Sequence, residues 1–228
     1  ALYRRVDWAW AQGGATTLRL GWRPKSGFLN YGWDGYNEAT KLYVLAAASP
    51  DHPISEDCYA GWTATYQWEN IYGFDVLYGG PLFMHQFSHA WVDFRGKREK
   101  RTPFVDYFEN SVQATRAQRE FFIKDLSKEF PNYGPNMWGM TASDFKKGYT
   151  AWGGPPRHPD TDGSVVPCAA AGSLMFTPDI TLPALKEMKA VYGKDIYGKY
   201  GFVDAFNPHN GWVDKDVLGI DLGITLLS

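Results

Sequence analysis

The sequence predicts an all-α fold that occupies residues 1–228 as a single domain. Five segments place their apolar side chains at the three- and four-residue spacing of an amphipathic helix. The 228 residues are 44% hydrophobic and 21% charged, a composition typical of a soluble globular protein with one sizeable core. No repeat of fixed period and no linker-like tract divides the chain, so one domain is expected.

The first predicted helix covers residues 36–48. Its side chains Tyr36, Leu42 and Tyr43 recur at helical spacing, and the sequence Ser-Pro-Asp-His-Pro that follows is a turn signal. The same periodicity predicts four further helices, at residues 57–72, 82–94, 104–129 and 179–192.

Prolines mark the two longest predicted helices. Pro103 precedes residues 104–129, as is common at a helix start, whereas Pro183 must lie in the first turn of its helix or kink it. Residues 131–177 form a connection longer than an ordinary loop and rich in glycine, proline and aromatic residues. We therefore expect this connection to be functional.

The charge pattern and the missing motifs exclude several classes of function. With 23 basic and 25 acidic residues the chain has a net charge of −2, which argues against a nucleic-acid partner. No apolar run reaches the ~18 residues of a membrane span. Phosphate-binding, dinucleotide-binding and nucleophile-elbow motifs are absent, so no cofactor is expected.

The cysteines and one histidine pair argue against a metal site. Cys58 and Cys168 are expected to be buried small residues, with a single disulfide as the alternative in an exported protein. His85 and His89 have the i, i+4 spacing of a zinc-protease helix, but Gln86 stands where that motif needs a glutamate base. We expect these histidines to be hydrogen-bonded within a polar cleft or the core.

Aromatic residues beside polar ones indicate a sugar-binding cleft. The chain has 10 Trp, 14 Tyr and 14 Phe, many of them next to Gly, Asn or Asp in predicted loops. A pyranose offers apolar faces to rings and hydroxyls to polar groups, which matches such a lining. The alternative for each ring is that it is simply part of the core.

Several carboxylates lie among aromatic or small residues. Glycoside hydrolysis needs one carboxylic acid to protonate the leaving oxygen and a second carboxylate to activate water or attack the sugar. The structural alternative for each acid is a cap or a loop hydrogen bond. The acids in this setting are Glu38, Asp93, Glu109, Asp144, Asp204 and Asp221.

Seven segments, in order, resemble the motifs of the bacterial putative-glucoamylase family. That family includes the endo-β-1,2-glucanases of glycoside hydrolase family 144 and the related domain of cyclic β-1,2-glucan synthases. The segments are GYNEATKLYVLAAASPDHP, LFMHQFSHAWVDFRG, YFENSVQATRAQREF, WGMTASD, DGSVVPCAAAGSLMFTPD, YGFVDAFN and LGIDLG.

The resemblance implies an (α/α)6 barrel of glucoamylase type and a β-1,2-glucan substrate. The family domain is roughly twice as long as this chain, as twelve ordinary helices require. The chain would then hold only the C-terminal part of the barrel, and a missing N-terminal half of the same domain would supply the rest. Leu222 and Ile224 depart from the Gln and Pro that the family usually has.

The resemblance also implies roles for individual residues. Glu38 matches the acid of the family's Trp-Asn-Glu-Ala motif and is the candidate proton donor; desolvation beside Trp33 and Tyr36 would keep it protonated. Glu109 and Asp144 rank first as the second carboxylate. Asp204 and Asp93 rank below them for this role. The residues expected to line substrate subsites are Trp33, Tyr66, Gln86, His89, Asp93, Arg95, Asn110, Trp138, Phe202 and Asp204.

Two other functions stay open. One is a glucan-binding module without catalysis, and the other is a transglycosylase that passes the glucan chain to a sugar hydroxyl. The segment ALYRRVDWAW at the start resembles what remains after processing of an exported precursor, so a periplasmic or secreted location is expected.

Overall fold

The structure is a computed structural model that describes residues 1–100, 104–155 and 160–228. These residues divide into two compact units. Unit 1 comprises residues 1–68 and 77–79, and unit 2 comprises residues 69–76 and 80–228. Whether the two units together form one domain, as the sequence predicts, stays a prediction.

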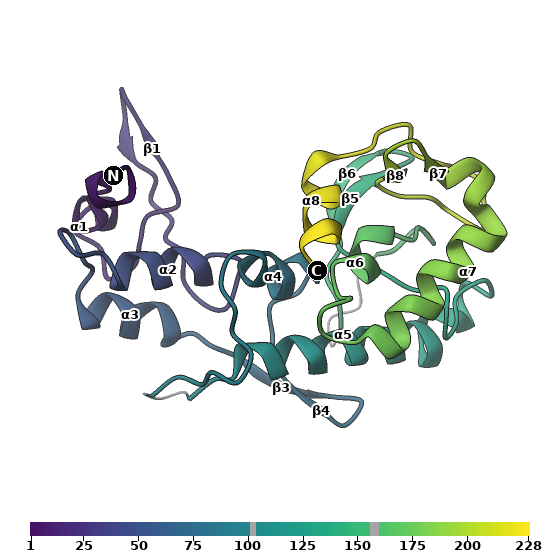
Figure 1. The fold of residues 1–228 in the computed structure, drawn as a ribbon, viewed down its shortest axis with the longest axis horizontal. Coiled ribbons are helices and arrows are strands. Elements are labelled where there is room, and N and C mark those ends of the chain that lie inside the picture. Colours follow the sequence, from purple (N-terminus) through teal and green to yellow (C-terminus); the bar gives the residue numbers. More distant parts are fainter. Residues whose placement is uncertain (101–103, 156–159) are drawn as a thin grey trace. The chain divides into compact units, whose positions relative to one another are not determined.

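Unit 1 consists of short helices and one small hairpin (Figure 1). Its core is a ring stack, because Tyr43 lies flat on Trp62 with ring centroids 4.2 Å apart. The Tyr43 hydroxyl donates to the Trp33 carbonyl over 2.7 Å, and Trp62 Nε1 donates to the Gly35 carbonyl over 2.7 Å. Both rings therefore fix the segment that leads to Glu38. The elements are η1 (Tyr3–Arg5), α1 (Trp8–Gln12), β1 (Trp22–Arg23), β2 (Gly27–Phe28), α2 (Thr40–Ala47) and α3 (Glu56–Thr63).

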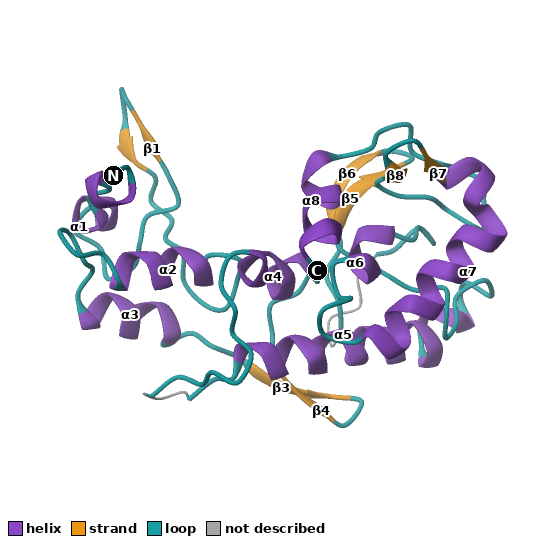
Figure 2. Cartoon of the chain, in the orientation of Figure 1, coloured by secondary structure: helices purple, strands orange, loops and turns teal. Residues whose placement is uncertain are grey.

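Unit 2 contains the longest helices and further hairpins (Figures 1 and 2). The hairpin of β3 (Trp68–Ile71) and β4 (Phe74–Leu77) spans the point in the chain where the units divide. The remaining elements are α4 (Phe83–Gln86), η2 (Phe87–Ala90), α5 (Tyr107–Lys124), η3 (Leu126–Lys128), β5 (Ala142–Phe145), β6 (Gly148–Ala151), α6 (Pro167–Ala171), α7 (Pro178–Ile196), β7 (Tyr197–Gly198), β8 (Gly201–Phe202) and α8 (Gly219–Leu227).

The core of unit 2 forms around α5 and α6. On α5, Ala114, Ala117 and Phe121 recur every three or four residues and are buried, which gives the helix one apolar face. Every residue of α6 is buried, and this short helix of small side chains contacts both α7 and α8. Small residues on α6 thus allow two neighbouring helices to approach the same point of the core.

The prediction of an all-α fold, and with it the all-helical (α/α)6 barrel, is wrong. The described residues form four two-stranded antiparallel sheets in addition to their helices (Figure 2). In the segment predicted as a helix at 57–72, α3 ends at Thr63 and β3 begins at Trp68. Tyr72 and Gly73 both have positive φ, as a tight two-residue hairpin turn requires, so the chain reverses there and cannot continue a helix.

The other predicted helices exist with shifted bounds. Helix α2 lies within the predicted 36–48, and α5 begins only after Asp106, whose side chain accepts the Glu109 N–H over 3.0 Å and caps the helix. Residues 82–94 form the short α4 followed by the 3-10 helix η2. In α7, Pro183 lies past the first turn, because the helix already begins at Pro178.

The connection 131–177 contains structure that the sequence did not predict. It includes the β5–β6 hairpin and α6, and its residues 156–159 lie outside the described residues. Helix α8 is likewise not among the five helices that the sequence predicts. Both free cysteines, Cys58 and Cys168, are buried, which confirms their expected burial.

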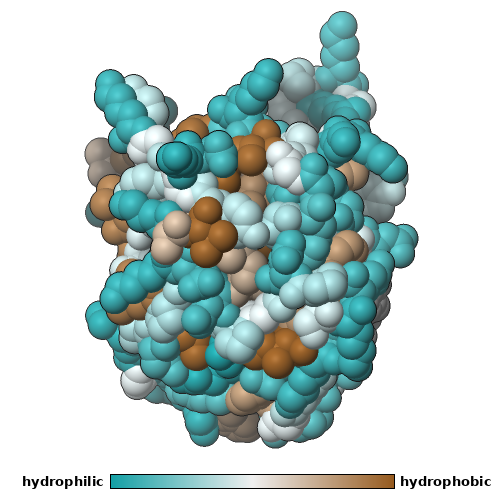
Figure 3. Space-filling view, turned by 90° about the vertical axis from the view of Figure 1, so that its right-hand side faces the viewer, coloured by the Kyte–Doolittle hydropathy of each residue, from teal (hydrophilic) through white to brown (hydrophobic). Residues whose placement is uncertain are grey.

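The surface of the chain is mixed in character. The face in Figure 3 is mostly hydrophilic and carries separate hydrophobic patches. Of the helices in the described ranges, none has both the length and the apolar character that crossing a bilayer would require.

Gly139 lies against the backbone next to α6, and we expect its replacement by alanine to destabilise the protein. An added Cβ would lie 2.8 Å from the Val166 carbonyl oxygen, and the φ of +137° already disfavours other residues. Gly148 is a matched control, because its φ is +136° but no atom lies within 4 Å of its would-be Cβ. Both variants should lose about 1 kcal/mol to backbone strain, and Gly139→Ala roughly 1–3 kcal/mol more. Urea unfolding measures both, and equal losses would contradict the close approach.

Candidate active site

Three aspartates of unit 2 place their carboxyl groups together. Asp144 lies on β5, Asp204 follows β8, and Asp214 belongs to the loop before α8; one oxygen of each lies within 4.8 Å of the others. Backbone pairing fixes this geometry, because the Asp204 N–H donates to the Asp216 carbonyl and the Asp214 N–H to the Ala205 carbonyl. Two loop segments thus run side by side and face β5.

Asp204 is the buried centre of the cluster. Asp204 is only 1% exposed, and its Oδ2 accepts the Asp144 backbone N–H over 2.7 Å. Its Oδ1 and the Oδ2 of Asp221 are both shielded from solvent and receive no backbone N–H, amide or hydroxyl donor from the described residues. The two carboxyl groups are hydrogen-bonded to each other. Such a bond needs one proton between them, so the two carboxyls share it.

The environment assigns that proton to Asp204. Burial is the largest cause that raises the pKa of Asp204, and the hydrogen bond and charge of Asp221 raise it further. Burial also raises the pKa of Asp221, but its hydrogen bonds to Asp204 and Cys168 act in the opposite direction. Asp204 is therefore the neutral partner and Asp221 the ionised one.

The neighbours of this pair extend the network. The thiol of Cys168 on α6 donates to Asp221, and burial, followed by the negative charge of Asp221, raises the pKa of that thiol. Asp144 is half-buried, and burial followed by the charges of Asp214 and Asp216 raises the pKa of its carboxyl. A carboxylate in such surroundings is a stronger base than one in water.

The cluster can therefore hold one proton in a buried carboxyl beside a more accessible carboxylate. Its spacing would also let Asp144, Asp204 and Asp214 share a cation, but nothing beyond the spacing in the described ranges indicates one. Acid and base forms of carboxyl groups side by side are what proton transfer requires.

Glu38 lies in unit 1, in the turn before α2. It is half-buried, and its backbone carbonyl accepts from Lys41 Nζ over 3.2 Å. Of its predicted neighbours, Tyr36 is buried and packs edge-on against Tyr66 with ring centroids 6.1 Å apart. Trp33, half-buried, is tied to Tyr43 through its carbonyl. Unit 1 thus brings the predicted acid into a segment held by aromatic residues.

Glu109 is separate from the aspartate cluster. It is exposed in the first turn of α5, and Oε1 of its carboxyl accepts from the Gln113 amide. The next residue, Asn110, is buried against His85, and its amide lies 3.4 Å from His85 Nδ1. Of the two acids ranked first from the sequence, the structure brings only Asp144 to other carboxylates.

The two histidines are hydrogen-bonded side chains, as expected; His85 is buried and His89 is half-buried. Ser111 donates to the His85 carbonyl over 2.8 Å, and its hydroxyl lies 3.1 Å from His89 Nε2. Burial lowers the pKa of His85 to about 3 and that of His89 to about 4, so both rings are neutral near pH 7. His89 also lines a cavity of about 230 Å³ with Asp93 and Arg95.

Asp93 and Arg95 form an exposed ion pair at the rim of that cavity. Arg95 Nε lies 2.9 Å from Asp93 Oδ1, and this hydrogen bond is the largest cause that lowers the pKa of Asp93. An exposed pair of this kind contributes little to stability, so both groups remain accessible to a ligand.

Two residues expected in subsites are placed in the core. Gln86 is 1% exposed, and its amide donates to the Ala169 carbonyl and to Ser173 Oγ over 2.8 Å each, which ties α4 to α6. Trp138 is fully buried. Phe202 on β8, in contrast, lines a cavity of about 580 Å³ together with Asp221.

The sequence reasoning missed Asp214 and gave Asp221 no role in the site. Asp214 directly follows Trp212 and Val213, and an aromatic neighbour is one of the features that singled out the other acids. The sequence therefore did contain a signal from which Asp214 could have been found. No local pattern, however, predicts that Asp221 and Asp204 share a proton.

The chain resembles known proteins along nearly its whole length. A family model described as putative glucoamylase matches residues 30–228. A curated protein of Parabacteroides distasonis, named exo β-1,2-glucooligosaccharide sophorohydrolase (non-reducing end), is 29% identical over 96% of this chain. The chain covers 34% of that protein.

Solved structures give the same result. An endo-β-1,2-glucanase from Chitinophaga pinensis, in complex with sophorotriose and glucose, matches 99% of this chain with a TM-score of 0.90 and 33% identity. A protein from Bacteroides uniformis described as a putative glucoamylase matches with a TM-score of 0.90 and 32% identity. The chain spans 56% of each of these two structures, so it corresponds to about half of their length.

Proposed function

Because the chain belongs to the putative glucoamylase family, we propose that it is part of a glycoside hydrolase that cleaves β-1,2-linked glucan, acting as an endo-β-1,2-glucanase. One observation carries the proposal: the likeness to the Chitinophaga pinensis endo-β-1,2-glucanase over 99% of this chain at 33% identity. The clustered carboxyl groups supply the chemistry that such a reaction uses.

The proposed roles follow from that chemistry. Glu38 donates a proton to the glycosidic oxygen of the leaving sugar, which makes that oxygen a better leaving group. A second carboxylate activates water or attacks the anomeric carbon. Asp144 is favoured over Glu109 for this role, because burial, followed by the charges of the neighbouring Asp214 and Asp216, raises the pKa of Asp144 and makes it a better base.

The partners of Asp144 keep it in place without competing with it. Asp204 accepts the Asp144 N–H, and its own carboxyl is neutral, so it adds no further negative charge beside Asp144. Asp204 is thus a positioning residue, and Asp144 is the group available to substrate.

The test is hydrolysis of linear β-1,2-glucan by the protein that carries this chain. We expect a ladder of β-1,2-linked oligosaccharides at early times, measured by anion-exchange chromatography, and no release from α-1,4-glucan. Sophorose as the sole early product would indicate exo action, as in the name of the Parabacteroides distasonis relative. Equal turnover of both glucans would contradict the linkage assignment.

The same assay separates the two alternatives. A glucan-binding module would bind the polysaccharide without releasing sugar, and a transglycosylase would produce longer chains when oligosaccharide acceptors are added. A periplasmic or secreted location is a further part of the proposal, and fractionation of the producing cells tests it.

A further inference from the structure

The β5–β6 hairpin has two chemically different faces. Its register pairs Ser143 with Thr150 and Phe145 with Gly148, so side chains alternate between the faces. Asp144 points to the face where the carboxylate cluster lies. Phe145 and Thr150 point to the opposite face, where they line a separate cavity of about 650 Å³.

Two aromatic rings form the apolar part of this cavity. Trp152, immediately after β6, packs edge-on against Phe145 with ring centroids 5.3 Å apart. Trp152 Nε1 donates to Ser143 Oγ over 3.2 Å, which holds the indole in one orientation. Because the rings are fixed before any ligand arrives, binding against them orders few side chains.

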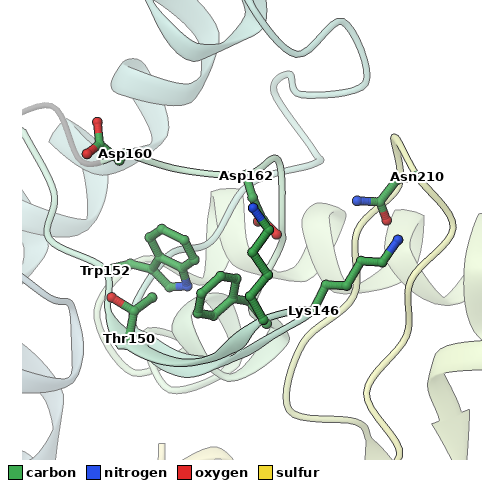
Figure 4. A pocket seen from close by; sticks show the side chains of 8 residues that line it. Lys146, Thr150, Trp152, Asp160, Asp162 and Asn210 are labelled. Carbon is green, nitrogen blue, oxygen red and sulfur yellow. The ribbon is translucent and has the colours of Figure 1, made fainter.

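The rim is polar and comes from three chain segments. Lys146 lies in the hairpin turn, Asp162 in the connection after it, and Asn210 in the loop that leads to the carboxylate cluster. Figure 4 shows the Lys146 amine directed toward Asn210, across the cavity from Trp152. Asn207 holds the two loops together, because its amide donates to the Asp162 carbonyl over 2.8 Å and its Oδ1 accepts the Asn210 N–H.

The charges of the lining balance. Two lysines in the hairpin turn, Lys146 and Lys147, oppose the carboxylates of Asp160 and Asp162, so the cavity does not select a charged ligand. Fixed rings with donors and acceptors at the rim suit a neutral pyranose, which offers apolar ring faces and hydroxyls. The volume is in the range of ordinary small-ligand sites.

From these observations we propose that the cavity formed by Phe145, Lys146, Trp152 and Asn210 is a second binding site for neutral glucan oligosaccharide, on the face of the hairpin away from Asp144. The proposal rests on the proposed function for the β-1,2 linkage of the ligand. A glucan chain held there would increase the local concentration of polymer near the carboxylate face without taking part in bond cleavage.

The test is a calorimetric titration with a β-1,2-linked glucooligosaccharide. The parent and all variants in this titration carry Glu38→Gln, which prevents hydrolysis of the ligand. Phe145→Ala should raise Kd at the second site about 5–15-fold, because it removes one ring wall. Lys146→Ala, at an exposed turn position that is safe for folding, should raise Kd about 2–5-fold. Tyr31→Ala, which removes an exposed ring in unit 1, is the matched control and should leave Kd unchanged.

The possible results separate this inference from the proposed function. Unchanged Kd in both cavity variants, or a single binding site in the parent protein, would overturn the inference. Weaker binding in the cavity variants, in a protein that never hydrolyses β-1,2-glucan, would support the inference and contradict the proposed function.

Discussion

Glu38→Gln is expected to lower kcat on linear β-1,2-glucan by roughly 10²–10⁴-fold while substrate binding is retained. Glutamine keeps the shape of the side chain but cannot donate a proton to the leaving oxygen. The alkaline limb of the pH–rate profile, which reports loss of that proton, should disappear with the carboxyl group. Steady-state kinetics between pH 4 and pH 9 measures both effects.

A substrate with a good leaving group provides the sharpest control for this role. Such a leaving group needs little protonation, so an activated aryl glycoside should recover much of the rate that Glu38→Gln loses. The matched variant Glu129→Gln changes an exposed glutamate in the loop after η3 and should keep the parent rate on both substrates. A loss of equal size on both substrates would place the proton donor elsewhere.

A structural role for Glu38 gives the opposite result. If the carboxylate only held the turn before α2, Glu38→Gln would cost about 1–3 kcal/mol of stability and leave turnover per folded molecule intact. Thermal unfolding of Glu38→Gln and Glu129→Gln therefore separates the structural role from the catalytic one. If Glu38 is the catalytic acid, Glu38→Gln should unfold close to the parent temperature.

Asp204→Asn is expected to make the protein less sensitive to alkaline pH. In the parent, burial raises the folded-state pKa of Asp204 above its unfolded value of about 3.9. Between these two pKa values the folded state binds more protons than the unfolded state, so the free energy of unfolding falls as pH rises. The contribution of Asp204 is fully present below pH ~4 and is lost as pH rises through the raised folded pKa.

Asparagine imitates the protonated form of Asp204. Its carbonyl oxygen can accept the Asp144 N–H, and its amide can donate to the Asp221 carboxylate, with no proton to lose. Relative to the parent, Asp204→Asn should therefore gain roughly 1–4 kcal/mol of stability between pH 5 and pH 9, since one pKa unit corresponds to about 1.4 kcal/mol. Urea unfolding at several pH values measures this difference.

Asp195→Asn is the control, because Asp195 is exposed near the end of α7. Its stability should follow the parent curve at every pH. A parent whose stability does not decline from pH 5 to pH 9 relative to Asp204→Asn would show that Asp204 is ionised in the folded state. The inference that Asp204 and Asp221 share one proton would then be wrong.

Local patterns in the sequence were enough for several features. The apolar spacing around α5 and α7 predicted both helices, because a face that recurs every three or four residues can be buried only as a helix. Cys58 and Cys168 were expected to be buried, and His85 and His89 to be hydrogen-bonded, and the structure shows both features. The seven motifs, in their order, indicated the putative glucoamylase family, and the family model that matches residues 30–228 confirms it.

The same patterns failed where a turn outweighed the helical spacing. Residues 68–72 continue the aromatic spacing of α3, but Tyr72 and Gly73 adopt positive φ and reverse the chain into a hairpin. In this segment the all-α prediction was wrong because the periodicity of side chains does not register a turn of two residues.

The sequence by itself determined which residue types the protein has for its chemistry, and the tertiary structure decided which of them meet. Asp144 and Asp204 are 60 residues apart, yet the Asp144 N–H donates to the Asp204 carboxyl because β5 and the loop after β8 pack together. Gln86 and Trp138 look equally suited to a cleft, but packing buries both in the core. Burial, shared protons and pKa values depend on neighbours distant in sequence, so only the folded chain fixes them.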